Sequence, residues 1–169
     1  MLKYLLISSI LTVSITSFSS KLYAQTSGAG AGIIIGGPTG ISGKFWTSSV
    51  NAIDLSLGWS NNGTWTHFGS GYVYYSTESL FHMNADYVWH SFHVIKSKER
   101  FPLYYGVGLH FDDGNTVPTA FGVRVVGGIE WMPRTVPLDI FLEIAPVFYV
   151  SPTIGMGMDA GFGARYFFN

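Results

Sequence analysis

Apolar and polar residues alternate without interruption from residue 80 to residue 90. One set of alternate positions is apolar, namely Phe81, Met83, Ala85, Tyr87 and Trp89. The other set is mainly polar, namely His82, Asn84, Asp86, Val88 and His90. Successive side chains of a β-strand point to opposite faces, so this period of two predicts a strand with one apolar and one polar face.

The same period of two recurs along most of the chain and predicts eight strands. They cover residues 29–36, 41–46, 52–60, 80–90, 103–111, 120–131, 138–149 and 158–168. Glycine dilutes the pattern in the first two, and Pro146 is expected at a bulge or near the end of its strand. The other six are close to the roughly 9 to 11 residues that a tilted strand needs to cross a membrane.

Alternation alone does not say which face looks inward, because a soluble barrel of the lipocalin kind shows the same pattern with its apolar side inside. Residue size favours the reverse arrangement. The polar face also carries the glycines Gly58, Gly106, Gly108, Gly122, Gly128, Gly161 and Gly163. An eight-stranded barrel has an interior just wide enough for side chains, so the face with small residues belongs inside. The chain is therefore predicted to be an all-β, eight-stranded antiparallel transmembrane β-barrel, with aromatic girdles near the strand ends.

The connections between strands predict an orientation. With both termini in the periplasm, connections 1, 3, 5 and 7 face outward, and we place the last three at residues 61–79, 112–119 and 150–157. The third is the longest and carries the aromatic and histidine residues Trp65, His67, Phe68, Tyr72, Tyr74 and Tyr75. An exposed aromatic cluster suits binding, but these side chains are equally suited to packing on the barrel rim.

Composition supports a membrane destination and excludes other classes. Only 11% of the 169 residues are charged, less than half of the roughly 25% usual in soluble domains. The net charge of −1, without a basic block, gives no sign of nucleic-acid binding. The chain contains no cysteine, which excludes disulfides and thiolate metal sites.

The first 24 residues predict a cleavable signal peptide. A short basic region at residues 1–3 precedes an apolar stretch at 4–15, and Leu22, Tyr23 and Ala24 form a plausible cleavage box. An N-terminal membrane anchor is the weaker alternative, because a helix needs about 20 apolar residues to span a membrane. We therefore expect residues 25–169 to form the exported barrel.

Several segments carry a resemblance to a known family. They are GGPTGISGK (36–44), ADYVWH (85–90), PLYYGVG (102–108), PLDIFLEIAP (137–146) and GFGARYFF (161–168). Through them the chain resembles the small eight-stranded outer-membrane barrels, such as the OmpA transmembrane domain and OmpX. It resembles more closely a family of short, uncharacterised bacterial outer-membrane barrels, over the whole mature chain.

The resemblance implies residence in the bacterial outer membrane. The partners that it implies are outer-membrane lipid, lipopolysaccharide and the outer-membrane assembly machinery. That machinery is thought to read a terminal aromatic residue, and here Asn169 follows Phe168.

The inward positions include several charges that predict a plug. They are Lys44, Arg124 and Arg165 against Asp54, Asp86, Glu130, Asp139, Glu143 and Asp159. A hairpin symmetric about Ser49 puts Lys44 opposite Asp54, and the strand pattern puts Arg124 one diagonal step from Glu143. Arg165 is expected between the heights of Asp139 and Glu143. Such charges are expected to pair and close the lumen, with water or His82, His90 and His110 joining them, while a selectivity filter or proton path is the alternative.

Catalytic and metal chemistry find little support in the sequence. A barrel enzyme acting on lipid A or phospholipid acyl chains needs a histidine beside a hydroxyl nucleophile. Only His67 with Ser70 offers this, since His90 and Ser91 point to opposite faces. His82, Asp86 and His90 share a face, but a spacing of four residues along a strand is roughly 13 Å, too far for one ion.

Asp112 and Asp113 are interpreted as part of an Asp-Gly turn. No cofactor or metal is expected. The sequence favours a non-enzymatic outer-membrane protein, structural or binding an extracellular or envelope ligand, with a small-solute pore or the lipid-modifying enzyme as alternatives.

Overall fold

The computed structural model describes residues 26–60, 65–68, 73–75, 79–115 and 118–168, with the backbone alone for 65–68 and 73–75. The expected signal peptide, residues 1–24, lies outside the described residues, as do Ser70, Tyr72 and Asn169. Within the described parts of the chain, no helix is long and apolar enough to cross a membrane.

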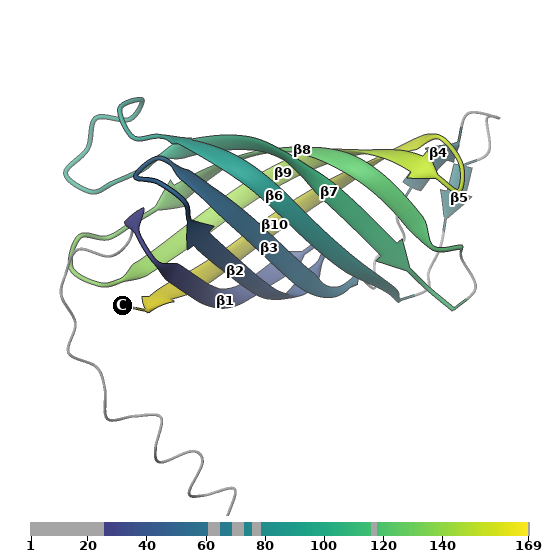
Figure 1. The fold of residues 1–169 in the computed structure, drawn as a ribbon, viewed down its shortest axis with the longest axis horizontal. Helices are drawn as coiled ribbons and strands as arrows, with labels where there is room; N and C mark the ends of the chain where they lie inside the picture. The colour runs from purple at the N-terminus through teal and green to yellow at the C-terminus, as the bar shows by residue number, and fades with distance from the viewer. Residues whose placement is uncertain (1–25, 61–64, 69–72, 76–78, 116–117, 169) are drawn as a thin grey trace, which may run out of the picture.

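The described chain consists of ten strands and the segments that connect them. The strands are β1 (Ala29–Gly36), β2 (Thr39–Trp46), β3 (Asn51–Ser60), β4 (Trp65–Phe68), β5 (Val73–Tyr75), β6 (Leu80–Ser91), β7 (Leu103–Asp113), β8 (Ala120–Trp131), β9 (Leu138–Ser151) and β10 (Gly155–Phe168). Eight of them pair in the order β1-β2-β3-β6-β7-β8-β9-β10, and β1 also pairs with β10. All of these pairs are antiparallel, so the sheet closes on itself and the predicted eight-stranded antiparallel barrel is confirmed (Figure 1).

The barrel has two distinct ends. The terminal end holds the start of β1 and the finish of β10, where Ala29 lies opposite Phe168, together with connections 47–50, 92–102 and 132–137. The loop end holds the connections 37–38 and 152–154, the ends of β3 and β7, and the starts of β6 and β8. In Figure 1 the terminal end is on the left and the loop end, with β4 and β5, is on the right.

The two-residue connection at 37–38 follows a glycine with positive φ. Gly36 has φ +139°, and a Cβ there would lie 2.1 Å from the carbonyl oxygen of Ala160 on β10. Only glycine fits such a close approach between strands. The backbone N–H of Gly36 then donates to the hydroxyl of Thr39, at 3.0 Å, which ties the two sides of the turn together.

Three expectations about strand limits are wrong. Asp112 and Asp113 belong to β7 rather than to a turn, because alternation continues through them. The connection before β10 covers only 152–154, since β9 and β10 both extend past the predicted limits. Pro146 lies inside β9, opposite Met158, and the register shift falls instead between Phe121 and Gly122.

The long third connection contains a hairpin that the sequence pattern did not predict. β4 and β5 pair with each other, and β4 also pairs with the start of β10, where Phe68 lies opposite Gly155 and His67 opposite Met156. The hairpin therefore extends the sheet at the loop end (Figure 1).

Burial is inverted relative to a water-soluble barrel. Charged side chains point inward and are almost inaccessible, with Arg124, Glu130 and Asp139 all 0% exposed. Large apolar side chains point outward, with Leu109 67% and Met158 62% exposed. The alternation predicted from the sequence is thus present with its polar face inside.

Candidate functional site

Lys44 is the first of three cations in the lumen and lies near the terminal end. The β2–β3 register places it directly opposite Asp54, and its Nζ is 3.4 Å from Asp54 Oδ2. Nζ also contacts Glu130 Oε1 and lies 2.9 Å from His90 Nε2. His90 Nδ1 lies 3.2 Å from the carbonyl oxygen of Val50, to which it can donate, so its Nε2 is free to accept from Lys44.

Arg165, from β10, binds at the same level of the barrel. Its guanidinium lies 3.2 Å from Asp54 Oδ2 and 3.3 Å from Asp139 Oδ2, and its Nε donates to the hydroxyl of Ser42 at 2.9 Å. The guanidinium also packs 3.8 Å from the centre of the Phe141 ring. The register pairs Arg165 directly with Asp139, not at a height between Asp139 and Glu143 as the sequence suggested.

Arg124 is the third cation and holds three carboxylates in the middle of the lumen. It lies 3.2 Å from Asp86 Oδ1, 3.0 Å from Glu143 Oε1 and 3.2 Å from Asp159 Oδ2. The register differs from the predicted diagonal step, because Arg124 lies opposite Val147, four residues from Glu143 along β9. The length of the arginine side chain closes that distance.

Tyr104 connects the ion pairs of Lys44 and Arg165 with those of Arg124. Tyr104, 2% exposed, donates from its hydroxyl to Glu143 Oε2 at 2.8 Å, and Lys44 lies 5.2 Å from the centre of its ring. The ring occupies space that a side chain at Gly128 would need, since a Cβ there would lie 2.4 Å from Tyr104 Cζ. The nine charged residues that the sequence places on the inner face are all buried, and ion pairs or this hydrogen bond bring them together: Lys44, Asp54, Asp86, Arg124, Glu130, Asp139, Glu143, Asp159 and Arg165.

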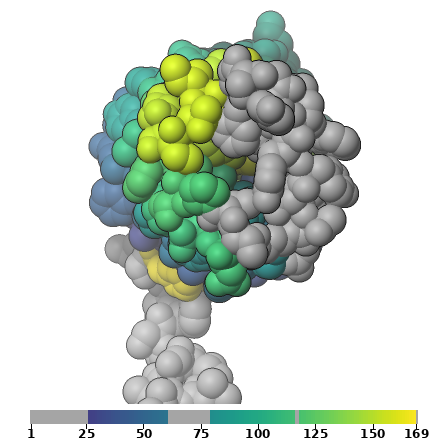
Figure 2. Space-filling model, turned by 90° about the vertical axis from the view of Figure 1, so that its right-hand side faces the viewer, coloured from purple at the N-terminus to yellow at the C-terminus, as the bar shows by residue number. Residues whose placement is uncertain are grey.

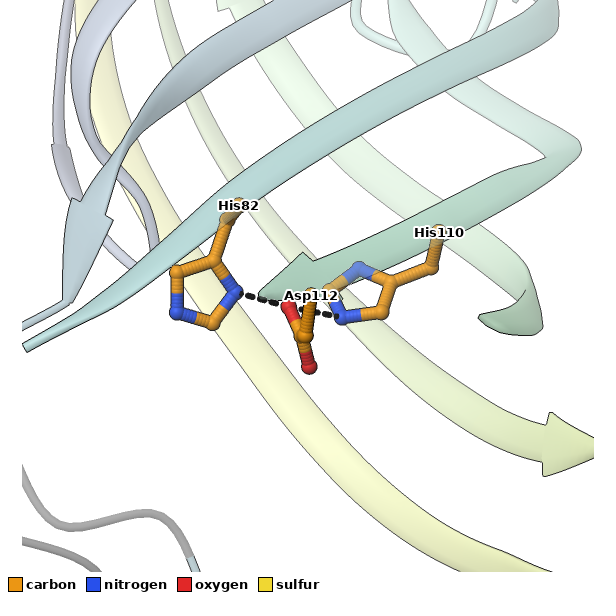
Figure 3. Close-up of side chains that lie close together, drawn as sticks. All are labelled: His82, His110 and Asp112. Carbon is orange, nitrogen blue, oxygen red and sulfur yellow. Dashed lines mark ion pairs between the residues drawn. The ribbon is translucent and has the colours of Figure 1, made fainter. Parts of the chain in front are cut away.

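A different group fills the lumen at the loop end. His82, from β6, and His110 and Asp112, from β7, converge there (Figure 3). Asp112 Oδ1 lies 2.5 Å from His82 Nδ1 and 2.8 Å from His110 Nε2. The hydroxyl of Tyr149 donates to Asp112 Oδ2 at 2.8 Å, and His110 Nδ1 lies 3.5 Å from Asp159 Oδ2, which links this group to Arg124.

The sequence pattern predicts that His82 and His110 join the charges in the lumen, but not that they converge on Asp112. Ligand spacing along one strand does not reveal a cluster that forms across the β6–β7 pair, in which His82 lies directly opposite Asp112. The prediction that Asp112 belongs to a turn conceals the cluster as well. Continued alternation through His110 and Asp112 was the available signal.

The outward face carries aromatic rings in two bands. Near the loop end, four rings form a chain in which each contacts the next, with ring centres 5.0–6.5 Å apart: Trp59, Phe81, Phe111 and Phe121. Near the terminal end, Trp89 contacts Tyr87 and Tyr105, and Phe101 stacks on Trp131. Between the bands the outward residues are mainly aliphatic, among them Leu55, Leu109, Val123 and Ile144.

The suspected binding loop is described only in part. The backbone of Trp65, His67, Phe68, Tyr74 and Tyr75 forms the β4–β5 hairpin. Tyr72 lies outside the described residues. Figure 2 looks onto the loop end, where the connection between β9 and β10, in yellow, and the start of β8, in green, form part of the rim.

No protein-family model, curated protein or solved structure matches this chain. The barrel architecture alone therefore supports its place among small β-barrels.

Proposed function

We propose that this protein spans the bacterial outer membrane as a small β-barrel with a charge-filled lumen, and that it has a structural or surface-binding rather than an enzymatic role. The observation that carries this proposal is the inversion of burial. Ile33, Leu109 and Ile144 are each at least 59% exposed on a face that also holds many other large apolar side chains.

A soluble protein does not expose an apolar surface of this extent to water. The largest apolar patch on a typical soluble monomer is about 300–600 Å², whereas here apolar side chains point outward from all eight strands of the closed sheet. Closure gives each of the eight barrel strands two hydrogen-bonded neighbours, as the hydrocarbon of a bilayer requires. The two aromatic bands occupy the positions of the girdles that flank the lipid-facing zone of outer-membrane barrels.

The contents of the lumen favour a plug over a pore. Lys44, Arg124 and Arg165 are each at most 2% exposed, and each pairs with an acid on a strand that is not its neighbour in the sheet. Lys44 joins β2 to β8, Arg124 joins β8 to β6 and β10, and Arg165 joins β10 to β3. A path for solutes would require these ion pairs to separate in a region of low dielectric, which is unfavourable.

Membrane fractionation combined with heat-modifiable gel migration tests the proposal. We expect the protein in the outer-membrane fraction, with unheated samples migrating differently from boiled ones because a folded barrel resists detergent. A soluble periplasmic product would contradict the proposal. Mass spectrometry of the same product is expected to show a mature chain beginning at Gln25.

Single-channel recording tests the closed lumen separately. Wild-type protein in a planar bilayer is expected to give no steady conductance. A steady conductance that changes in Arg124→Ala would favour the small-solute pore instead.

The surface-binding role is assigned to the hairpin at the loop end. We expect lipopolysaccharide or another envelope component to bind there through aromatic side chains. Replacing Trp65, Phe68, Tyr74 and Tyr75 together by serine is expected to weaken binding of the folded protein to lipopolysaccharide-containing vesicles. Unchanged binding would contradict this assignment. A change in the lipid A mass spectrum on expression would instead favour a barrel enzyme that modifies lipid acyl chains.

A further inference from the structure

The histidine cluster at the loop end differs chemically from the rest of the lumen. Its ligand-type atoms, one each from His82, His110 and Asp112, all lie within 4.8 Å of one another (Figure 3). All three side chains are at least nine-tenths buried. Lys44, Arg124 and Arg165 neutralise carboxylates elsewhere in the lumen, but no described lysine or arginine contacts Asp112.

The hydrogen bonds around His110 fix which of its nitrogens faces the cluster with a lone pair. The side-chain amide of Asn84 donates from Nδ2 to the hydroxyl of Ser56 at 3.0 Å, which leaves its Oδ1 to accept. That oxygen lies 2.5 Å from His110 Nδ1, so Nδ1 carries the proton. In the neutral ring, Nε2 is then an acceptor, yet it lies 2.8 Å from Asp112 Oδ1, which is also an acceptor. The Tyr149 hydroxyl, 3.3 Å from Nε2, has one proton and donates it to Asp112 Oδ2 at 2.8 Å.

His82 also has a ring nitrogen that no described hydrogen-bond partner satisfies. Its Nδ1 lies 2.5 Å from Asp112 Oδ1, and its Nε2 has no hydrogen-bond partner among the described residues. His90 at the opposite end shows the satisfied arrangement, because its Nε2 accepts from Lys44. At the loop end, acceptors face one another and a positive centre is needed between them.

The charge of the whole lumen points the same way. Among the described buried residues, seven are acidic and three are lysine or arginine. With neutral histidines the lumen therefore carries an excess of negative charge, which a divalent cation would reduce.

We propose that His82, His110 and Asp112 bind a divalent transition-metal ion of the zinc class. Two imidazole nitrogens and one carboxylate oxygen, with a water in the fourth position, form a tetrahedral zinc site. Ligand atoms about 2.0–2.2 Å from a tetrahedral ion are about 3.4 Å apart, so Asp112 Oδ1 moves away from the two imidazoles, from 2.5 Å and 2.8 Å, when the ion binds. Calcium and magnesium prefer sites made of oxygen and do not suit two imidazoles.

The surroundings support the proposed ligands. Asn84 orients His110 through the nitrogen that does not bind the ion, and Tyr149 holds the second oxygen of Asp112 at 2.8 Å. Such partners orient ligands in known metal sites. The side chain of Asp112 is 8% exposed, so the ion enters from the loop end. The site depends on the barrel fold and not on insertion into a membrane.

Isothermal titration of tag-free, chelator-treated barrel in detergent with Zn²⁺ tests the proposal. At neutral pH we expect one ion per wild-type chain, and at least about tenfold weaker binding in His82→Ala, His110→Ala and Asp112→Asn. His93→Ala and Asp113→Asn are matched controls, because both residues are exposed and neither belongs to the cluster. Heat-modifiable migration confirms that each variant is folded.

Titration of wild-type protein with Co²⁺ gives a second measurement that needs no variant. The strong visible absorption of tetrahedral Co²⁺ is expected, and a chelator in excess is expected to abolish it. Zn²⁺ binding to wild type no tighter than to Asp112→Asn, or equal loss in His93→Ala, would overturn the proposal, and protons would then hold the cluster together. Tighter binding of Ca²⁺ than of Zn²⁺ would also overturn it.

Discussion

The inner and outer faces of the barrel are made by the same strands but obey opposite rules. In β9, Phe141 and Glu143 point inward and are 1% and 7% exposed, whereas their neighbours Leu142 and Ile144 point outward and are 55% and 60% exposed. Inside the barrel, each charged side chain is paired with polar side chains from other strands. Outside, charge is almost absent. The difference shows that this chain pairs its polar groups inside the barrel and exposes its apolar groups on the outer face.

The largest effect is expected from breaking the inner face. Arg124→Met removes the cation shared by Asp86, Glu143 and Asp159, leaving buried carboxylates unpaired. We expect the free energy of unfolding in urea to fall by about 3–5 kcal/mol at neutral pH. The control is Arg134→Met, since Arg134 is exposed in the connection 132–137, where the expected loss is about 1 kcal/mol or less. Equal losses in the two variants would contradict the pairing rule.

A charge added to the outer face tests the other rule. Leu109 is 67% exposed near the middle of β7, so Leu109→Lys is expected to destabilise the barrel folded in lipid vesicles by about 2–4 kcal/mol. Ile154 is 75% exposed in the connection 152–154 at the loop end, and Ile154→Lys is expected to cost about 0–1 kcal/mol. Reversible unfolding from vesicles measures both. Similar values for the two would mean that the middle of the outer face does not meet hydrocarbon.

Adjacent glycines on the two faces give the smallest and most local test. A Cβ at Gly128, which points inward, would lie 2.4 Å from Tyr104 Cζ and 2.6 Å from the carbonyl oxygen of Leu142. A Cβ at Gly127, which points outward, would meet nothing within 4 Å. Gly128→Ala is therefore expected to cost about 1–3 kcal/mol of unfolding free energy, and Gly127→Ala almost none. If Gly127→Ala were as costly, crowding of the lumen would not explain the glycines.

Much of the fold could be predicted because the barrel depends on local signals. Period-two alternation located the eight barrel strands, and the glycines on the polar face indicated which side was narrow. The pairing of Lys44 with Asp54 followed from one short hairpin. Each of these inferences needs only neighbouring residues or a two-stranded turn.

The loop-end cluster could not be predicted in the same way. His82 meets Asp112 through the β6–β7 register, which the long connection 92–102 does not fix in advance. The reach of Arg124 to Glu143 depends on the length and direction of its side chain as well as on the strand register. The β4–β5 hairpin lies in a stretch without clear alternation, so its pairing with β10 was also missed.

Fluorescence quenching of single-tryptophan variants by brominated lipids tests the central claim most directly. Trp59 and Trp131 are 57% and 40% exposed on the outer face, near opposite ends, whereas Trp46 is 5% exposed inside the barrel. In variants that keep one of these three residues and carry phenylalanine at the other tryptophan positions, we expect strong quenching of Trp59 and Trp131 and weak quenching of Trp46. Equal quenching of all three, or quenching of Trp46 alone, would contradict a barrel whose apolar face lies against lipid.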